Sequence, residues 1–183
     1  MGWMGVEVLG SLGFGLLVGS LAMVAFGADS LVELLSASVV LRHLKDDVGG
    51  SQTVGDRTAW FSSLLLLSLL PIIGLGAAYA YLSGIRPEGS PVGIAIAVGA
   101  VVVMPYLWLK KRKVGEATNC LPLKIDSVES MTCFLMSVAL LAGLLAEYFL
   151  RLWWADYLAT GVILAFVGKE AVESYQEARL SEI

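Results

Sequence analysis

Two carboxylates lie four residues apart within one long apolar stretch of the sequence, at Asp29 and Glu33. On a helix, positions i and i+4 lie on one face, with Cβ atoms roughly 6 Å apart. A charged side chain inside a membrane is costly, and where one occurs it commonly marks a path for ions or protons. Carboxylate oxygens at a fixed separation are also the ligands that hard and borderline divalent cations need. The pair therefore predicts a binding site for cations or protons.

The composition indicates a membrane protein without a soluble domain. Of the 183 residues, 57% are hydrophobic and 15% are charged, and the mean hydropathy is +0.80. Soluble domains have about 45–50% apolar residues. A spanning helix needs about 20 apolar residues, so the chain has room for roughly six such helices with short loops. The net charge of −4, without a long basic stretch, gives no support for nucleic acid as a partner.

We predict an all-α fold, a polytopic bundle of six transmembrane helices that forms a single transmembrane domain over residues 1–183. The predicted helices cover residues 3–18, 21–44, 59–82, 91–109, 125–150 and 153–177. A polar loop over residues 45–57 connects the second helix to the third, and a basic loop over residues 110–124 connects the fourth to the fifth.

The distribution of Lys and Arg among the loops predicts the orientation. The loop between the fourth and fifth helices carries Lys110, Lys111, Arg112, Lys113 and Lys124. The opposite side carries only Arg86 and Arg151. Cytoplasmic loops of membrane proteins are enriched in Lys and Arg. We therefore expect a multi-pass protein of the cell (plasma or inner) membrane with both termini in the cytoplasm.

A second polar face opens the predicted fifth helix. Its members recur at i, i+3, i+4 and i+7 and span about 100° of the helix: Asp126, Glu129, Ser130 and Cys133. With a rise of 1.5 Å per residue and a core about 30 Å thick, Glu33 lies roughly 12 Å from the inner surface. Ser130 and Cys133 lie roughly 9–14 Å from the inner end of their helix. Because the two polar faces reach the same depth, one site can use both.

Structural roles are open for two members of this face. Asp126 either binds a cation, pairs with Lys124 or caps the fifth helix. Cys133 is of a type more often packed in a core than used as a ligand. The acid pair on the second helix has the weakest structural explanation, because the apolar segments carry no cation to neutralise it. Either the pair binds an exogenous cation, or at least one of its acids is protonated.

Three further acids lie in or beside apolar segments. Asp156 follows Trp154 and is predicted to be the N-terminal cap of the sixth helix. Glu7 in the first helix and Glu147 in the outer part of the fifth are intramembrane acids, which act as proton or gating groups or pair with Arg151.

Several kinds of chemistry find no support in the sequence. Cys120 and Cys133 form no CxxC motif, and the single histidine, His43, rules out a bis-histidine haem. No Walker A motif is present, so transport would run on a gradient and not on ATP. We find no nucleophile–base pair and no di-histidine metal motif. We therefore expect no enzyme, no catalytic residue and no permanently bound cofactor.

Short motifs along the chain resemble the transmembrane part of the cation diffusion facilitator family. Asp29-Ser-Leu-Val-Glu33 is similar to the D-x-x-x-D motif of that family's second helix, and Gly19-Ser20 resembles the turn before it. Trp153-Trp-Ala-Asp156 and Lys169-Glu-Ala-Val-Glu-Ser174 resemble the start and the cytoplasmic end of that family's sixth helix. Three further segments are similar to small prokaryotic homologues without the cytoplasmic metal-binding domain: Phe26-Gly-Ala-Asp-Ser30, Val103-Met-Pro105 and Ile125-Asp-Ser127.

The resemblance implies six helices, a homodimer formed through them, and exchange of a divalent cation for protons. It implies that Asp29 and Glu33 are metal ligands. The family's ligand positions on the fifth helix fall on Ser130 and Phe134, and neither supplies a strong ligand. The same face offers Asp126, Glu129 and Cys133 as replacements.

Together these observations predict a proton-coupled exporter of divalent metal cations, an antiporter surrounded by membrane lipid. Zinc is the first choice of cation, and manganese, iron(II), cobalt and cadmium are alternatives because the site is rich in oxygen. Two other functions stay open: a proton-coupled organic-cation exporter that uses the same acids, and a non-transporting membrane scaffold or regulatory subunit.

Overall fold

The computed structural model describes residues 2–46, 52–117 and 121–180, and in that part of the chain it contains six α-helices and no strand. The helices are α1 (Gly2–Val18), α2 (Leu21–Asp46), α3 (Gln52–Leu82), α4 (Pro91–Ala117), α5 (Leu121–Leu150) and α6 (Trp154–Leu180). The predicted all-α bundle is confirmed.

The helices on either side of the basic segment extend further than the sequence predicted. α4 runs to Ala117 and α5 begins at Leu121, so the predicted loop over residues 110–124 is wrong in extent. Lys, Arg and Glu are good helix formers and prolong a helix beyond its apolar part. Arg112 also pairs with Glu116 one turn later, at 2.9 Å. The polar loop predicted over residues 45–57 is also shorter, since α2 runs to Asp46 and α3 begins at Gln52.

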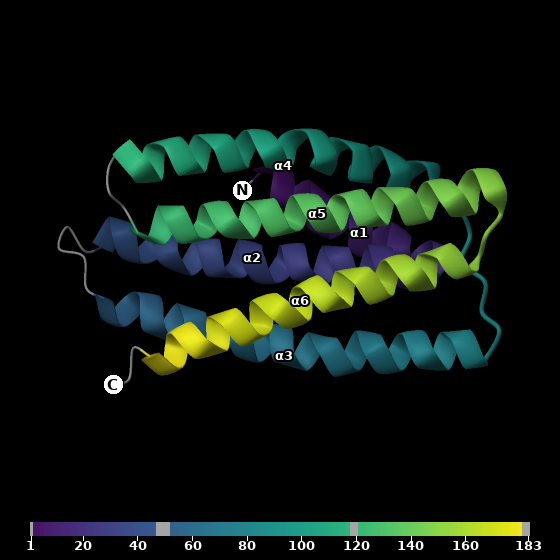
Figure 1. Ribbon diagram of the computed structural model, residues 1–183, viewed down its shortest axis with the longest axis horizontal. Coiled ribbons are helices and arrows are strands. Elements are labelled where there is room, and N and C mark those ends of the chain that lie inside the picture. Colours follow the sequence, from purple (N-terminus) through teal and green to yellow (C-terminus); the bar gives the residue numbers. More distant parts are fainter. Residues whose placement is uncertain (1, 47–51, 118–120, 181–183) are drawn as a thin grey trace.

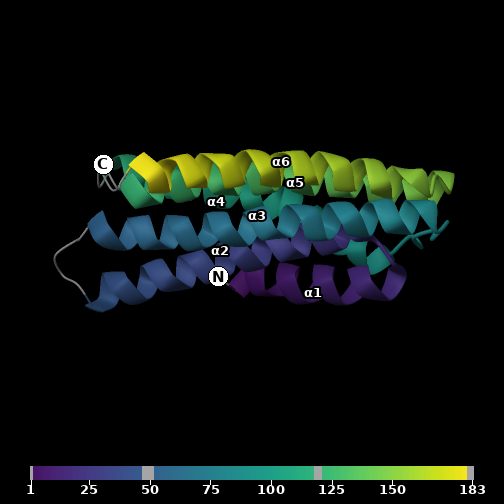
Figure 2. The ribbon, with the colours of Figure 1, turned by 90° about the horizontal axis from the view of Figure 1, so that it is seen from below.

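The six helices lie side by side, with their connections at the two ends of the bundle (Figures 1 and 2). α2 is the central helix and packs against α1, α3, α5 and α6. α4 packs mainly against α5, and α3 mainly against α6. A residue on α2 can therefore meet side chains from several other helices.

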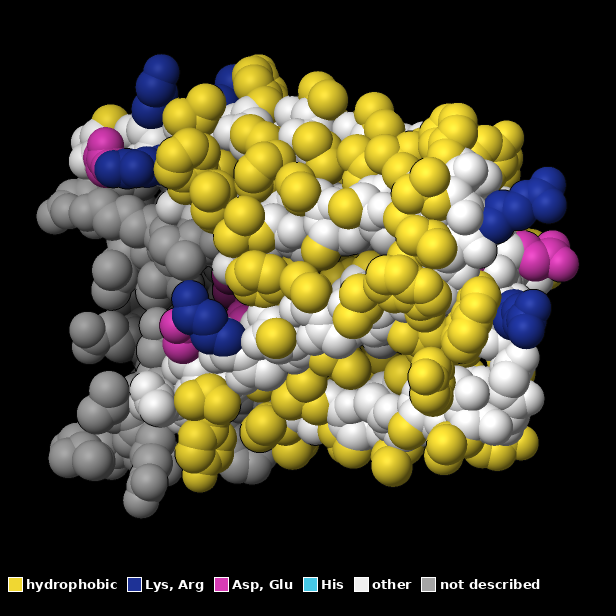
Figure 3. Space-filling view, turned by 45° about the vertical axis from the view of Figure 1, so that its right-hand side comes forward, with side chains coloured by type: hydrophobic (Ala, Val, Ile, Leu, Met, Phe, Trp, Pro, Cys, Tyr) yellow, Lys and Arg dark blue, Asp and Glu magenta, His cyan; other side chains and the backbone are white. Residues whose placement is uncertain are grey.

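The surface of the bundle is apolar along its length. On the face shown in Figure 3, hydrophobic side chains cover the middle, and Lys, Arg, Asp and Glu gather toward the two ends. Among the described residues, Pro91–Val114 and Glu129–Leu150 are long and apolar enough to cross a membrane, and Gly2–Val18 and Leu67–Leu82 are shorter apolar helices. Tyr81, Trp153 and Tyr157 form an aromatic cluster at one end, as is common at a membrane interface.

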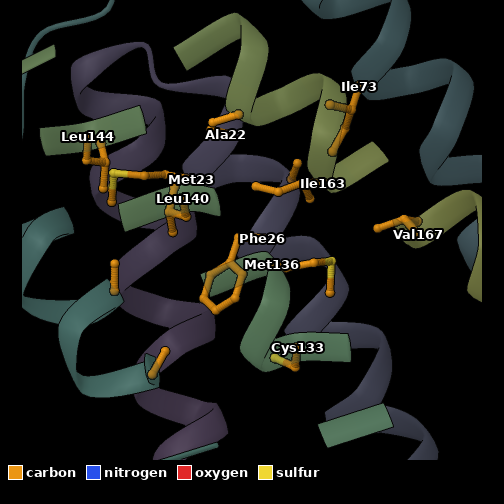
Figure 4. Packing of buried hydrophobic residues seen from close by; sticks show 14 of the residues in the cluster. Ala22, Met23, Phe26, Ile73, Cys133, Met136, Leu140, Leu144, Ile163 and Val167 are labelled. Atoms are coloured by element: carbon orange, nitrogen blue, oxygen red, sulfur yellow. The ribbon is translucent and has the colours of Figure 1, made fainter. Parts of the chain in front are cut away.

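The core between α2, α5 and α6 is tightly packed (Figure 4). Phe26, Met136, Leu140 and Ile163 are fully buried there. Cys133 lies one helical turn before Met136 on α5 and belongs to the same cluster. At Cys133 the apolar core therefore borders the polar residues Asp29 and Glu33 of α2.

Asp156 caps α2 and not α6, which corrects the sequence prediction. α6 already begins at Trp154, so Asp156 lies inside its first turn. Its carboxylate accepts hydrogen bonds from the Ser20 hydroxyl and from the backbone amides of Leu21 (3.0 Å) and Ala22 (3.4 Å). The first amides of a helix lack partners within the helix and carry a partial positive charge, so they attract a carboxylate. The contact fixes the height of α2 relative to α6.

Candidate metal centre

The centre starts from Asp29 and Glu33, which α2 places on one face. Asp29 is fully buried and Glu33 is half-buried. In the described part of the chain, neither oxygen of Asp29 has a hydrogen-bond partner, and Oε1 of Glu33 also has none. A buried acceptor without a partner is costly, so these oxygens are free to bind a ligand.

Cys133 of α5 joins the two acids. One carboxylate oxygen of Asp29, one of Glu33 and the Cys133 Sγ all lie within 4.8 Å of one another. The ligand atoms of a tetrahedral zinc ion stand roughly 3.5 Å apart. Small side-chain rotations would therefore bring all three to coordinating distance. The Ser137 hydroxyl donates a hydrogen bond to the Cys133 carbonyl at 2.6 Å, which leaves the thiol out of that bond.

The other predicted residues of α5 differ in their surroundings. The Ser130 hydroxyl is buried and accepts a hydrogen bond from Lys111 Nζ at 2.8 Å. Glu129 is half-buried and interacts electrostatically with Asp29 and Glu33. The Asp126 side chain lies outside the described residues. Phe134, the second position implied by the resemblance, is partly buried and packs against the apolar core. The described residues thus bring Cys133 to the acid pair, with Glu129 close enough to interact.

A cation from outside the apolar segments lies near the acids, which the sequence did not predict. Lys111 interacts electrostatically with Glu33, and its ammonium group reaches Ser130 on α5. The sequence suggested otherwise because Lys111 lies in a segment interpreted as a loop. α4 continues through this segment as a helix, and a lysine side chain is long enough to extend along the protein surface.

Two further acids interact with the centre and were not predicted as part of it. Glu170 of α6 interacts electrostatically with Asp29 and Glu33, and its Oε2 atom is buried with no hydrogen-bond partner in the described structure. Glu7 of α1 is fully buried and interacts with Asp29. For Glu7, an acid within an apolar helix was the available signal, whereas Glu170 lies in a charged stretch of α6. The sequence did not reveal which helices lie next to α2.

The arrangement suits a divalent cation. Several carboxylates from different helices meet in an apolar surrounding, where like charges repel strongly. A divalent cation between Asp29 and Glu33 removes that repulsion and occupies their unpartnered oxygens. Two carboxylates and one thiol form a mixed donor set, which suits zinc and neighbouring transition metals more than magnesium or calcium.

Comparisons with known proteins identify the family of the chain, and the family match begins after Asp29 and Glu33. The family model of the cation efflux transmembrane domain matches residues 50–181, which is more than half of the chain and includes Cys133. Over 87 residues the chain is 31% identical to the cation-efflux pump FieF of Shewanella oneidensis. That match covers 47% of this chain and 29% of FieF, so the chain spans well under half of that relative. The chain belongs to the cation efflux family, the cation diffusion facilitators, whose members are membrane-bound cation transporters and not enzymes.

Proposed function

We propose that the protein is a proton-coupled exporter of divalent metal cations, with zinc as the first choice of cargo. The observation that carries the proposal is the meeting of Asp29, Glu33 and Cys133, with ligand atoms within 4.8 Å of one another. Membership of the cation efflux family supports cation transport. The oxygen-rich donor set keeps manganese, iron(II), cobalt and cadmium as alternative cargoes.

Competition between metal and protons for the same atoms supplies the coupling. A carboxylate or thiol must be deprotonated to bind a metal, so metal binding releases protons. In one orientation of the bundle Asp29, Glu33 and Cys133 hold the cation, and in the other they hold protons. Alternating access then needs only rocking of the helices around a fixed site, as in other secondary transporters.

The proposal includes an orientation and an assembly. The end of α4 with Lys110, Lys111 and Arg112 faces the cytoplasm, as do both termini, because Lys and Arg are enriched in cytoplasmic loops. Tyr106 and Trp108 support an interface at that end, since Lys110 and Arg112 lie over their rings at 4.7 Å and 5.7 Å. Residues 1–183 act as a single transmembrane domain, and a homodimer forms through the membrane helices.

The test is zinc flux into proteoliposomes under an imposed pH gradient. Wild-type protein should transport zinc in proportion to the gradient, and Glu33→Gln should reduce the flux to the background of empty liposomes. Glu116→Gln is the control, because Glu116 is an exposed glutamate of α4 that pairs with Arg112 at 2.9 Å and has no part in the centre. It should keep its flux.

Two results would contradict the proposal. One is equal flux in wild type and Glu33→Gln. The other is a folded wild type that transports none of the candidate metals, which would favour an organic-cation cargo or a scaffold function.

A further inference from the structure

The interface between α1 and α2 contains three buried polar side chains that the proposed centre does not use. Glu7 and Ser11 lie one helical turn apart on α1, and Ser30 lies on α2. All three are fully buried. In the described structure, Glu7 Oε2, Ser11 Oγ and Ser30 Oγ have no hydrogen-bond partner. Such atoms are expensive where no water is available to bind them.

Other serines of the same bundle show what a buried hydroxyl does when it is structural. Ser137 of α5 is also fully buried, and its hydroxyl donates to the carbonyls of Cys133 (2.6 Å) and Phe134 (3.1 Å). Ser38 of α2 donates to the Leu34 carbonyl in the same way. This bond to the preceding turn is the usual solution for serine within a helix. Ser11 and Ser30 lack it, which indicates that their oxygens are kept for another partner.

The packing of α1 on α2 brings these side chains to one level. Gly15 lies against Met23, and Gly27 lies against Ser11, where an added Cβ would come within 2.9 Å of the Ser11 Cβ. Continued three residues along both antiparallel helices, this register predicts that Ser30 lies opposite Val8, within about one helical turn of Glu7 and Ser11. The two glycines allow the close approach that holds this register.

Trp3, which packs against α4, holds Glu7 in place. The Trp3 indole donates a hydrogen bond to Glu7 Oε1 at 2.6 Å. The Trp3 ring lies over Gly99 of α4, where no side chain other than glycine leaves it room. One oxygen of Glu7 is therefore fixed by Trp3, and the other is available to a ligand.

The three side chains adjoin the candidate metal centre on the α1 side of Asp29. Ser30 follows Asp29 directly in the sequence, and Glu7 interacts electrostatically with Asp29. By the helical rise, Ser30 lies roughly 14 Å from the outer end of α2, at the depth of the acid pair. A carboxylate and two hydroxyls are oxygen ligands of the kind that divalent cations use.

We propose that Glu7, Ser11 and Ser30 form a second binding subsite for the transported cation, on the α1 side of Asp29. The subsite deepens the proposed transport function and rests on it for the identity of the cation. A cation bound there has Asp29 as its neighbour, so it can pass to the Asp29–Glu33–Cys133 centre without entering the apolar core. The full chain should accordingly bind two cations.

The experiment counts Zn²⁺ bound to the purified full chain by equilibrium titration in lipid nanodiscs. Wild type should bind two ions per chain. The double variant Asp29→Ala/Glu33→Ala should keep one ion, and addition of Glu7→Gln to that background should remove it. Ser11→Ala should weaken the binding of the second ion by roughly tenfold or more. Ser137→Ala is the matched control, because it removes a buried hydroxyl that is already hydrogen-bonded within its own helix. This variant should bind both ions as wild type does.

Each outcome decides the proposal. Wild type could bind a single ion that is lost in Asp29→Ala and unchanged in Glu7→Gln and Ser11→Ala. This result would overturn the subsite and keep the proposed transport function. An ion that depends on Glu7 in a protein with no zinc flux would keep the subsite and overturn the transport function. No second ion at any zinc concentration would assign the polar side chains to bound water and overturn the subsite. If Glu7→Gln fails to fold, Ser11→Ala gives the same answer with a smaller change.

Discussion

Asp156 and Asp29 are both buried aspartates within membrane helices of one bundle, and they differ in what their oxygens contact. Asp156, 1% exposed, accepts hydrogen bonds from the Ser20 hydroxyl and the amides of Leu21 and Ala22. Asp29, 0% exposed, has no hydrogen-bond partner among the described residues. The first carboxylate completes a helix terminus, and the second is left available to a ligand.

The comparison shows that the partners of a buried acid, and not its burial, indicate its role. A buried acceptor without a partner costs about 1–3 kcal/mol, and more when it is charged. Asp156 avoids this cost by joining α6 to the start of α2. Asp29, which lies two helical turns further along α2, has this cost because its oxygens lack hydrogen-bond partners among the described residues.

The largest effect on stability should come from Asp156→Ala. The change leaves the Ser20 hydroxyl and the first amides of α2 without an acceptor, so the free energy of unfolding should fall by about 3 kcal/mol. Chemical unfolding in detergent, followed by circular dichroism, measures it. Asp29→Ala is the comparison, and without metal it should unfold at the same denaturant concentration as wild type or a higher one. An equal loss of stability in both variants would show that the two acids do the same structural work.

A smaller effect should follow from Cys133→Ser. Replacing the thiol by a hydroxyl removes the soft ligand of the centre, so zinc and cadmium should bind about tenfold more weakly, which corresponds to about 1.4 kcal/mol. Manganese, which prefers oxygen ligands, should be affected less. Competition titrations with the three metals measure the change in preference. Equal weakening of all three metals would assign Cys133 to packing.

The smallest effect should come from Lys111→Gln. The ammonium group of Lys111 interacts with Glu33 and repels a cation bound there, so its removal should tighten zinc binding about two- to fivefold. Lys110→Gln is the matched control, since Lys110 lies over the Tyr106 ring, and this variant should bind zinc as wild type does. Weaker binding in Lys111→Gln would mean that the lysine supports the site through its bond to Ser130.

The sequence predicted the helices and the acid pair because both depend on local patterns. Apolar stretches of membrane length mark the helices, and the spacing of Asp29 and Glu33 places them on one face. The depth of Cys133 also followed from the helical rise. Each of these features can be read within a single helix.

The features that the sequence missed depend on contacts between helices. The partners of Asp156 are Ser20, Leu21 and Ala22, more than 130 positions away along the chain. The reach of Lys111 to Ser130 depends on the continuation of α4 as a helix and on its packing against α5. The place of Glu7 depends on the register of α1 on α2, which two glycines set through close backbone approach. A single sequence carries no direct signal for such pairings.

The most direct test compares Zn²⁺ binding by Asp29→Asn and Asp156→Asn in the same purified chain. Both variants remove one buried carboxylate charge and keep the size of the side chain. Asp29→Asn should weaken binding at the Asp29–Glu33–Cys133 centre by at least two orders of magnitude, with the thermal stability of the metal-free protein unchanged. Asp156→Asn should keep the affinity and melt at a lower temperature. Unchanged zinc affinity in Asp29→Asn, or an equal loss of affinity in both variants, would contradict the assignment of Asp29 as a cation ligand.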